Sequence, residues 1–330
     1  MVKRHVRRRS SLITFAVGAV LFAVQVSAQD APRIGFLSAL SYDAFPSRID
    51  AFRQGLKDLG YIEGKNILVE YRWADGRPER LAALAAELEQ LKVAVIVSAG
   101  PSATRPARQA TKSTPIVMGF DSDPVGSGFV DSLARPGGRI TGLSFLAPEI
   151  SAKQVDVLRQ IIPGLVRIAV LGDSKEPGNA RGLEEAKRAA DALGLQARAI
   201  DMRAARNVAA AFAAARHGGA QAIVLLPSPL FAPDTAAEFV RAAAAERLPA
   251  MYWNGSIVER GGLLSYSANM DDLFRRAAIY VDKILKGAKP GELPVEQPYK
   301  FDLIVNVKAA KEIGLVIPMS VLSRADRVIQ

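Results

Sequence analysis

Short runs of apolar, mostly β-branched residues alternate along the chain with longer stretches in which apolar residues recur every three or four positions. The run at 33–37 predicts a first strand, and Ile49, Phe52 and Leu56 lie on one face of a helix predicted over 44–59. Strands that alternate with helices of this length form right-handed βαβ units around a parallel sheet. The pattern therefore predicts an α/β fold.

The same alternation occurs twice, which predicts two lobes. The first set of strands is expected at 33–37, 67–71, 93–97, 116–120 and 140–143. The second set is expected at 167–171, 196–200, 222–226 and 250–253. Each set forms a doubly wound parallel sheet with helices on both faces, and ordinary chain near 142–147 joins the two lobes.

The chain beyond residue 261 is too short for a third domain. It predicts a strand over 263–266, a helix over 271–285 and a last strand over 299–305. We therefore expect the chain to return to lobe one and then to cross to lobe two. The expected division is 33–143 with 263–297 for lobe one, and 147–254 with 299–330 for lobe two.

The N-terminal segment has the order of a secretory signal peptide. Five basic residues precede the apolar run at 12–24, and the small residues at 26–28 follow it. The run has 13 residues, whereas a membrane-spanning helix needs about 20. We expect cleavage after Ala28 to release an exported protein from a signal peptide over 1–28; a buried N-terminal helix is the alternative.

Charge and cysteine content restrict the partners and the compartment. The formal charge of +10 falls to +5 without the signal segment, and the remaining basic residues are spread along helices, so nucleic acid is not an expected partner. The chain has no cysteine, which excludes disulfides, thiolate metal sites and a lipid anchor at the cleavage site. We therefore expect an unanchored protein in the periplasm.

The residues that catalysis usually requires are scarce. There are two histidines: His5 lies in the signal segment, and His217 precedes two glycines at a helix end, where a capping role suffices. No G-x-S-x-G, H-E-x-x-H or G-x-G-x-x-G motif occurs. The sequence therefore predicts no enzyme activity, no metal and no cofactor.

Polar and aromatic residues follow the predicted strands. In open parallel sheets, ligands bind beyond the carboxyl ends of the strands. Small hydroxyl groups and helix N-termini suit a carboxylate, a carboxylate side chain suits an ammonium, and aromatic rings offer apolar walls. The candidate ligand-binding residues are Ser38, Tyr42, Gly100, Pro101, Asp121, Ser122, Asp123, Asp173, Ser228, Tyr252, Trp253 and Tyr266. The alternative is that they are ordinary helix caps and turn residues.

Several segments together resemble a known family. They are IGFLS at 34–38, AFRQGL at 51–56, GYIEGKN at 60–66, EYRWA at 70–74, DPV at 123–125, RPGGRITG at 135–142 and LSRAD at 322–326. The chain resembles the ABC-transporter substrate-binding family related to tryptophan- and tyrosine-binding receptors. The resemblance implies a type I periplasmic-binding-protein fold, with two lobes, three crossovers and a ligand cleft between the lobes.

The ligand-contacting loops of that family correspond here to Ser38, 100–101, 121–123, Asp173, Ser228 and 252–253. Two of these loops depart from the family pattern. Residues 121–124 read Asp-Ser-Asp-Pro where family members often have Gly-Gly-Asp-Pro, and residues 172–179 replace a loop of Asn-Pro-Asn type. Both departures add acidic residues near the expected cleft.

The sequence thus predicts a periplasmic receptor that closes on a small polar or aromatic solute, such as an amino acid or a small carboxylate, and delivers it to an ABC permease. One alternative is a receptor that presents its closed form to a membrane sensor. Another is an exported α/β enzyme, which the missing nucleophile–base pair disfavours. A transcriptional regulator of the same fold would need a helix-turn-helix where this chain has a signal segment.

Overall fold

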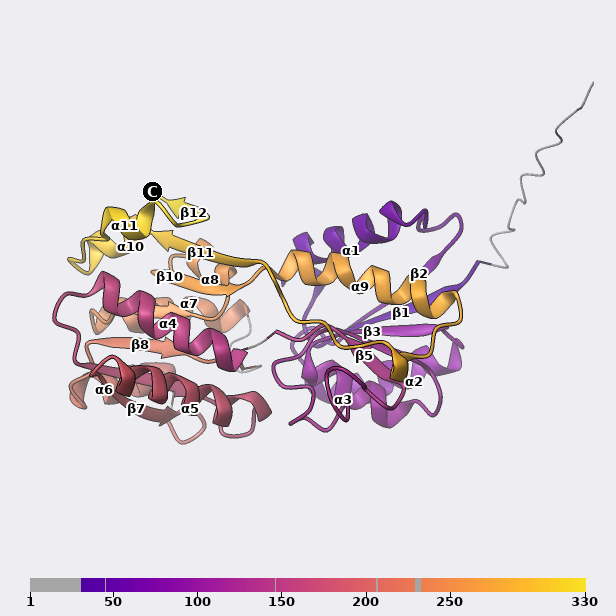
Figure 1. Cartoon of the computed structure of the whole chain (residues 1–330), viewed down its shortest axis with the longest axis horizontal. Coiled ribbons are helices and arrows are strands. Elements are labelled where there is room, and N and C mark those ends of the chain that lie inside the picture. Colours follow the sequence, from indigo (N-terminus) through magenta and orange to yellow (C-terminus); the bar gives the residue numbers. More distant parts are fainter. Residues whose placement is uncertain (1–30, 45, 146, 206, 229–232) are drawn as a thin grey trace, which may run out of the picture.

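The computed structural model of the chain describes residues 31–44, 46–145, 147–205, 207–228 and 233–330. The predicted signal peptide and its cleavage site lie outside these residues. Two α/β lobes lie side by side along the long axis of the molecule (Figure 1). Among the described residues, no helix is long and apolar enough to cross a membrane.

Lobe one has a five-stranded parallel sheet in the order β2-β1-β3-β4-β5. Its strands are β1 (Arg33–Ser38), β2 (Leu68–Trp73), β3 (Val95–Ala99), β4 (Ile116–Phe120) and β5 (Ile140–Gly142). Helices α1 (Pro46–Asp58) and α9 (Met270–Leu285) cover one face, and α2 (Leu81–Gln90) and α3 (Pro101–Ala110) cover the other. The inner strands β3 and β4 read as largely apolar runs because both of their faces are buried, whereas the edge strand β2 carries charged residues and is only partly buried.

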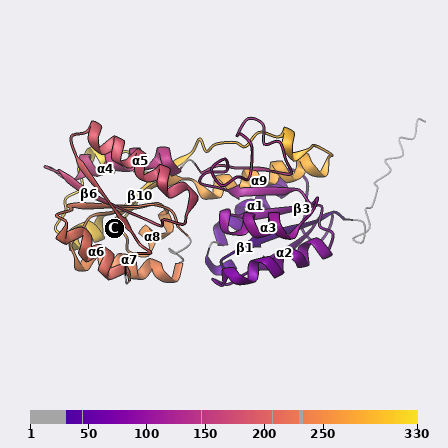
Figure 2. The same cartoon turned by 90° about the horizontal axis from the view of Figure 1, so that it is seen from below.

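Lobe two has a seven-stranded sheet in the order β12-β11-β10-β9-β8-β6-β7. Its strands are β6 (Arg167–Gly172), β7 (Gln196–Asp201), β8 (Ala222–Leu225), β9 (Ala250–Tyr252), β10 (Leu264–Ala268), β11 (Phe301–Asn306) and β12 (Arg327–Ile329). One face is covered by α4 (Ala147–Ile161), α5 (Pro177–Ala192), α10 (Val307–Glu312) and α11 (Met319–Leu322). The other is covered by α6 (Val208–His217), α7 (Pro233–Ala245) and α8 (Gly255–Glu259). Figure 2 shows these layers from below.

The predicted fold class is confirmed, with two corrections. The strand predicted over 263–266 was assigned to lobe one, but β10 pairs with β9 and β11 in the sheet of lobe two. The sheet is also not wholly parallel, because β11 runs antiparallel to β10. The chain crosses between lobes after β5, between β10 and α9, and between α9 and β11. Only α9 and the following short 3₁₀ helix (Pro290–Glu292) therefore return to lobe one.

Candidate functional site

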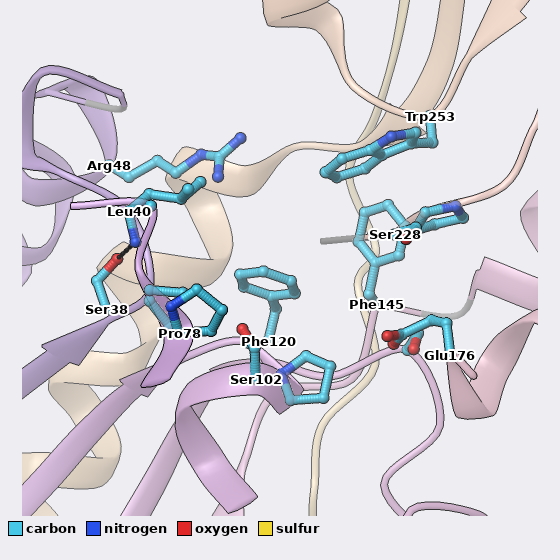
Figure 3. Close-up of a pocket in the computed structure, with 17 residues that line it drawn as sticks. Ser38, Leu40, Arg48, Pro78, Ser102, Phe120, Phe145, Glu176, Ser228 and Trp253 are labelled. Atoms are coloured by element: carbon cyan, nitrogen blue, oxygen red, sulfur yellow. Dashed lines mark hydrogen bonds between the residues drawn. The ribbon is translucent and has the colours of Figure 1, made fainter. Parts of the chain in front are cut away.

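A cavity lies between the lobes, where the carboxyl ends of their strands face each other (Figure 3). Its empty volume is about 920 Å³, a figure that includes the open solvent at its mouth. The lining residues are Ser38, Ala39, Leu40, Arg48, Gly76, Pro78, Ala99, Gly100, Pro101, Ser102, Phe120, Ser122, Phe145, Glu176, Pro227, Ser228 and Trp253. The last four belong to lobe two, so the cavity is complete only when both lobes are present.

Three aromatic rings form a wall that reaches from one lobe to the other. The ring centroids of Phe120 and Phe145 are 6.4 Å apart, and those of Phe145 and Trp253 are 6.5 Å apart with the rings nearly perpendicular. Gly100 makes room for this wall, since a Cβ there would lie 2.8 Å from Phe120 Cζ. Rings in edge-to-face contact around a cavity suit an apolar or aromatic part of a ligand.

One end of the cavity is acidic. Glu176, in the loop before α5, lines it from lobe two, and Ser122 lines it from lobe one. The Ser122 Oγ is buried and makes no hydrogen bond of good geometry within the described part of the chain, but it lies near the Glu176 carboxylate and acts to lower its pKa. Burial raises the pKa of Glu176 to about 7, and the charge of Asp173 adds to the effect. Burial likewise raises the pKa of Asp121, the residue before Ser122, to about 7.

Arg48 lines the opposite end of the cavity, near Leu40 in Figure 3. Its side chain is buried, and burial lowers the pKa of the guanidinium to about 10, although the charges of Asp271 and Glu259 oppose that shift. Those two acids line a second, polar hollow on the other side of Arg48. Arg48 therefore lines both the cavity between the lobes and the polar hollow that contains Asp271 and Glu259.

Asp173 organises the lobe-two side without lining the cavity. Its carboxylate accepts hydrogen bonds from both Arg203 Nε and Nη2, from Ser228 Oγ at 2.8 Å and from the backbone N–H of Lys175 at 3.0 Å. Burial alone would raise the pKa of Asp173, but the hydrogen bonds, above all those from Arg203, outweigh it and lower the pKa. Asp173 is therefore ionised, and its carboxylate holds the Ser228 hydroxyl in place at the cavity.

The structure places six of the twelve predicted site residues against the cavity. They are Ser38, Gly100, Pro101, Ser122, Ser228 and Trp253. The other six lie away from it: Tyr42, Asp121, Asp123, Asp173, Tyr252 and Tyr266.

The contacts of each of these six residues show what its side chain does instead. Tyr42 is 38% exposed and meets the edge of Trp73, and Tyr252 is buried in the core of lobe two. Asp123 accepts the backbone N–H of Gly126 in a turn, and Tyr266 stacks on Phe301 at a ring distance of 5.9 Å. Asp121 is fully buried and accepts the backbone N–H of Asp123, and Asp173 accepts the hydroxyl of Ser228.

Sequence reasoning missed several lining residues. Phe120 and Phe145 read as core residues because they end or follow buried strands. Arg48 lies on a helix rather than in a loop, although an arginine beside Ile49 on the apolar face of α1 is a signal that could have been used. Glu176 lies in a loop that departs from the family pattern, which was a usable signal.

Acidification is expected to favour the arrangement seen here, in which the two lobes meet and bury Glu176 and Asp121; we call this the closed form. An acid whose pKa is raised in the closed form binds its proton more tightly there than in solvent, where acidic pKa values are about 4. The closed form therefore gains stability as the pH falls through about 7, and the gain is complete below about 4. The charged groups that face Glu176 and Asp121 are Asp123, Asp173, Arg105 and Arg203.

Small-angle scattering would measure this effect as a smaller radius of gyration at about pH 5 than at about pH 8. Glu176→Gln should reduce the difference, because the amide does not titrate. An unchanged or larger radius at acidic pH would contradict the expectation.

Comparison with known proteins identifies the chain. A family model described as "ABC transporter substrate binding protein" matches residues 33–329. The chain belongs to this family. The resemblance found in its sequence motifs is therefore confirmed, and the protein is a solute-binding receptor.

Individual relatives agree with the family. The receptor is 21% identical over 283 residues to a tyrosine-binding protein of Clostridioides difficile strain R20291, covering 86% of this chain and 81% of that one. A structure of an ABC domain in complex with L-Trp from Streptococcus pneumonia has a TM-score of 0.83 and 26% identity, with 91% and 100% of the chains covered. The ligand-free, open structure of a substrate-binding protein with adhesive properties from Clostridium difficile has a TM-score of 0.71 and 22% identity, with 91% and 99% covered.

Proposed function

We propose that the receptor captures a solute with an aromatic or apolar body between its lobes and delivers it to an ABC permease. The observation that carries the proposal is the ring wall of Phe120, Phe145 and Trp253, which continues from lobe one to lobe two. Trp253 packs against the cores of both lobes, so closing the lobes buries a solute against it. The relatives named for tyrosine and for L-Trp support a ligand with a ring.

Binding is proposed to occur without chemical change. The family is one of substrate-binding proteins, and the cavity lining is made largely of aromatic rings, prolines and small residues. The site is proposed to work outside the cytoplasm, in the periplasm, after removal of residues 1–28. The mass of the exported protein checks this, since cleavage after Ala28 leaves Gln29 as the first residue.

A thermal-shift screen followed by calorimetry tests the proposal. We expect L-tryptophan, tryptamine, indole-3-propionate or their phenyl counterparts to stabilise the protein, while ribose and L-glutamate do not. A ligand at a hundredfold excess over its Kd stabilises the native state by about 2.7 kcal/mol. Calorimetry should give one ligand per monomer, and mass spectrometry should recover the ligand unchanged. Stabilisation by the ring-free solutes alone would contradict the proposal.

A further inference from the structure

The acidic end of the cavity holds polar groups whose hydrogen-bonding capacity is not used. Ser122 is only 8% exposed and lines the cavity. Its Oγ makes no hydrogen bond of good geometry with a described residue, although it lies near enough to the Glu176 carboxylate to lower the pKa of that group. Asp121, the residue before Ser122, has one carboxylate oxygen, Oδ2, that is buried and makes no hydrogen bond with a described residue. Buried polar atoms without partners are unfavourable in a folded protein and mark places where something else supplies the bond.

The two lobes meet at this end. A Cβ on Gly178, in the first turn of α5, would lie 2.8 Å from Ser122 Oγ, so only a glycine lets lobe two approach lobe one this closely. Glu176 stands two residues before Gly178 and directs its carboxylate into the cavity, below Phe145 and Trp253 (Figure 3). Closure therefore brings Glu176 of lobe two towards Ser122 and Asp121 of lobe one.

Negative charge predominates where the lobes meet. The acids that act on one another there are Asp121, Asp123, Asp173 and Glu176, and the cations nearest to them are Arg105 and Arg203. Arg203 is engaged by Asp173, and Arg105 is an exposed residue that lies over the Phe129 ring. Burying carboxylates without a balancing cation is unfavourable, and it raises the pKa of both Asp121 and Glu176.

We infer that the solute carries a positively charged amine, which binds at this end of the cavity between Glu176 and Ser122. An ammonium has three N–H donors and no acceptor, which matches a carboxylate and a hydroxyl oxygen that both accept. The inference rests on the proposed function, because the ring wall holds the body of the same solute. It also assigns a role to the two loops in which this chain departs from its family, 121–124 and 172–179.

The opposite end of the cavity offers less to a negatively charged group. Arg48 is the charged residue of the lining there, and Asp271 and Glu259 act on its charge from the other side. An anionic group on the solute would compete with these two acids for Arg48. We therefore expect the loss of the ammonium from a ligand to reduce affinity more than the loss of a carboxylate.

Calorimetry with matched ligands tests the inference. L-tryptophan carries both groups, tryptamine lacks the carboxylate, and indole-3-propionate lacks the ammonium; phenylalanine, 2-phenylethylamine and 3-phenylpropionate form a second series. We expect the amine of each series to bind at least about 10-fold more tightly than the propionate, since a hydrogen bond to a charged group contributes enough for a 10- to 100-fold change.

Variants place the effect on the named residues. Glu176→Gln should weaken amine binding ~10- to 100-fold and leave propionate binding unchanged or tighter, whereas Glu176→Asp should retain much of the amine affinity. Glu184→Gln is the matched control, because Glu184 is an exposed acid farther along α5 and outside the cavity lining. Ser122→Ala should weaken amine binding and Ser127→Ala should not, since the buried Ser127 lies outside the lining.

Propionates that bind as tightly as the amines, or amine affinity that Glu176→Gln leaves unchanged, would overturn the inference and leave the proposed function standing. If no ring compound of either series binds, the proposed function fails and the inference fails with it. The ligand comparison on the unmodified protein remains decisive if a variant does not fold.

Discussion

Trp253→Ala is expected to weaken ring-ligand binding by ~1–3 kcal/mol, which corresponds to roughly 5- to 150-fold in Kd. The indole lines the cavity, meets the edge of Phe145 and leaves its Nε1 without a partner in the described structure. Its truncation removes the lobe-two part of the ring wall, so a bound solute keeps less apolar contact on closure. Calorimetry with L-tryptophan and tryptamine measures the change.

Trp73→Phe is the matched control. Trp73 stacks on Tyr71 in lobe one at a ring distance of 5.8 Å and lies outside the cavity lining, so its replacement should leave affinity unchanged. A Trp253→Ala variant with a lower melting temperature but the same affinity per folded molecule would show that Trp253 serves only packing.

Phe274→Ala is expected to lower the free energy of unfolding by ~3–5 kcal/mol, the range for truncating a buried phenylalanine. Phe274 is 1% exposed on the returning helix α9, and its ring lies 6.0 Å from that of Phe36 and 6.1 Å from that of Phe120. A Cβ on Gly119 would lie 2.7 Å from Phe274 Cε1, so the ring is packed directly on the sheet. The variant leaves a void beneath the wall residue Phe120 as well as in the core.

Urea unfolding measures this loss. Ile279→Ala on the same helix is the control, because Ile279 is 40% exposed and surface substitutions usually change stability by about 0.5 kcal/mol or less. A loss below about 1 kcal/mol for Phe274→Ala would contradict the packing described for α9.

The sequence predicted the inner strands well because both faces of each sheet are covered, which makes strands such as β3 and β8 short apolar runs. It could not assign β10 to the correct lobe, since a buried strand has the same composition in either sheet. The sequence also did not show that β11 runs antiparallel to β10, because the pairing direction depends on where the preceding chain re-enters the sheet.

The predicted residues that line the cavity all lie at or just after the ends of strands. The rule that ligands bind beyond the carboxyl ends of strands located Ser38, Ser122 and Ser228 at the cavity. It could not separate Tyr252 from Trp253, because successive residues of a strand face opposite sides and the register of that strand is not visible in the sequence. It also could not show Phe120 and Phe145, whose apolar side chains resemble those of the core.

The central claim, that a solute binds between the lobes against the ring wall, is tested most directly by the fluorescence of Trp253. The chain has two tryptophans, so Trp73→Phe leaves Trp253 as the only indole. The variant is titrated with L-phenylalanine and with 2-phenylethylamine, which contain no indole. We predict a saturable shift of the Trp253 emission that matches the calorimetric Kd. Saturable binding by calorimetry with no change in that emission would contradict the account.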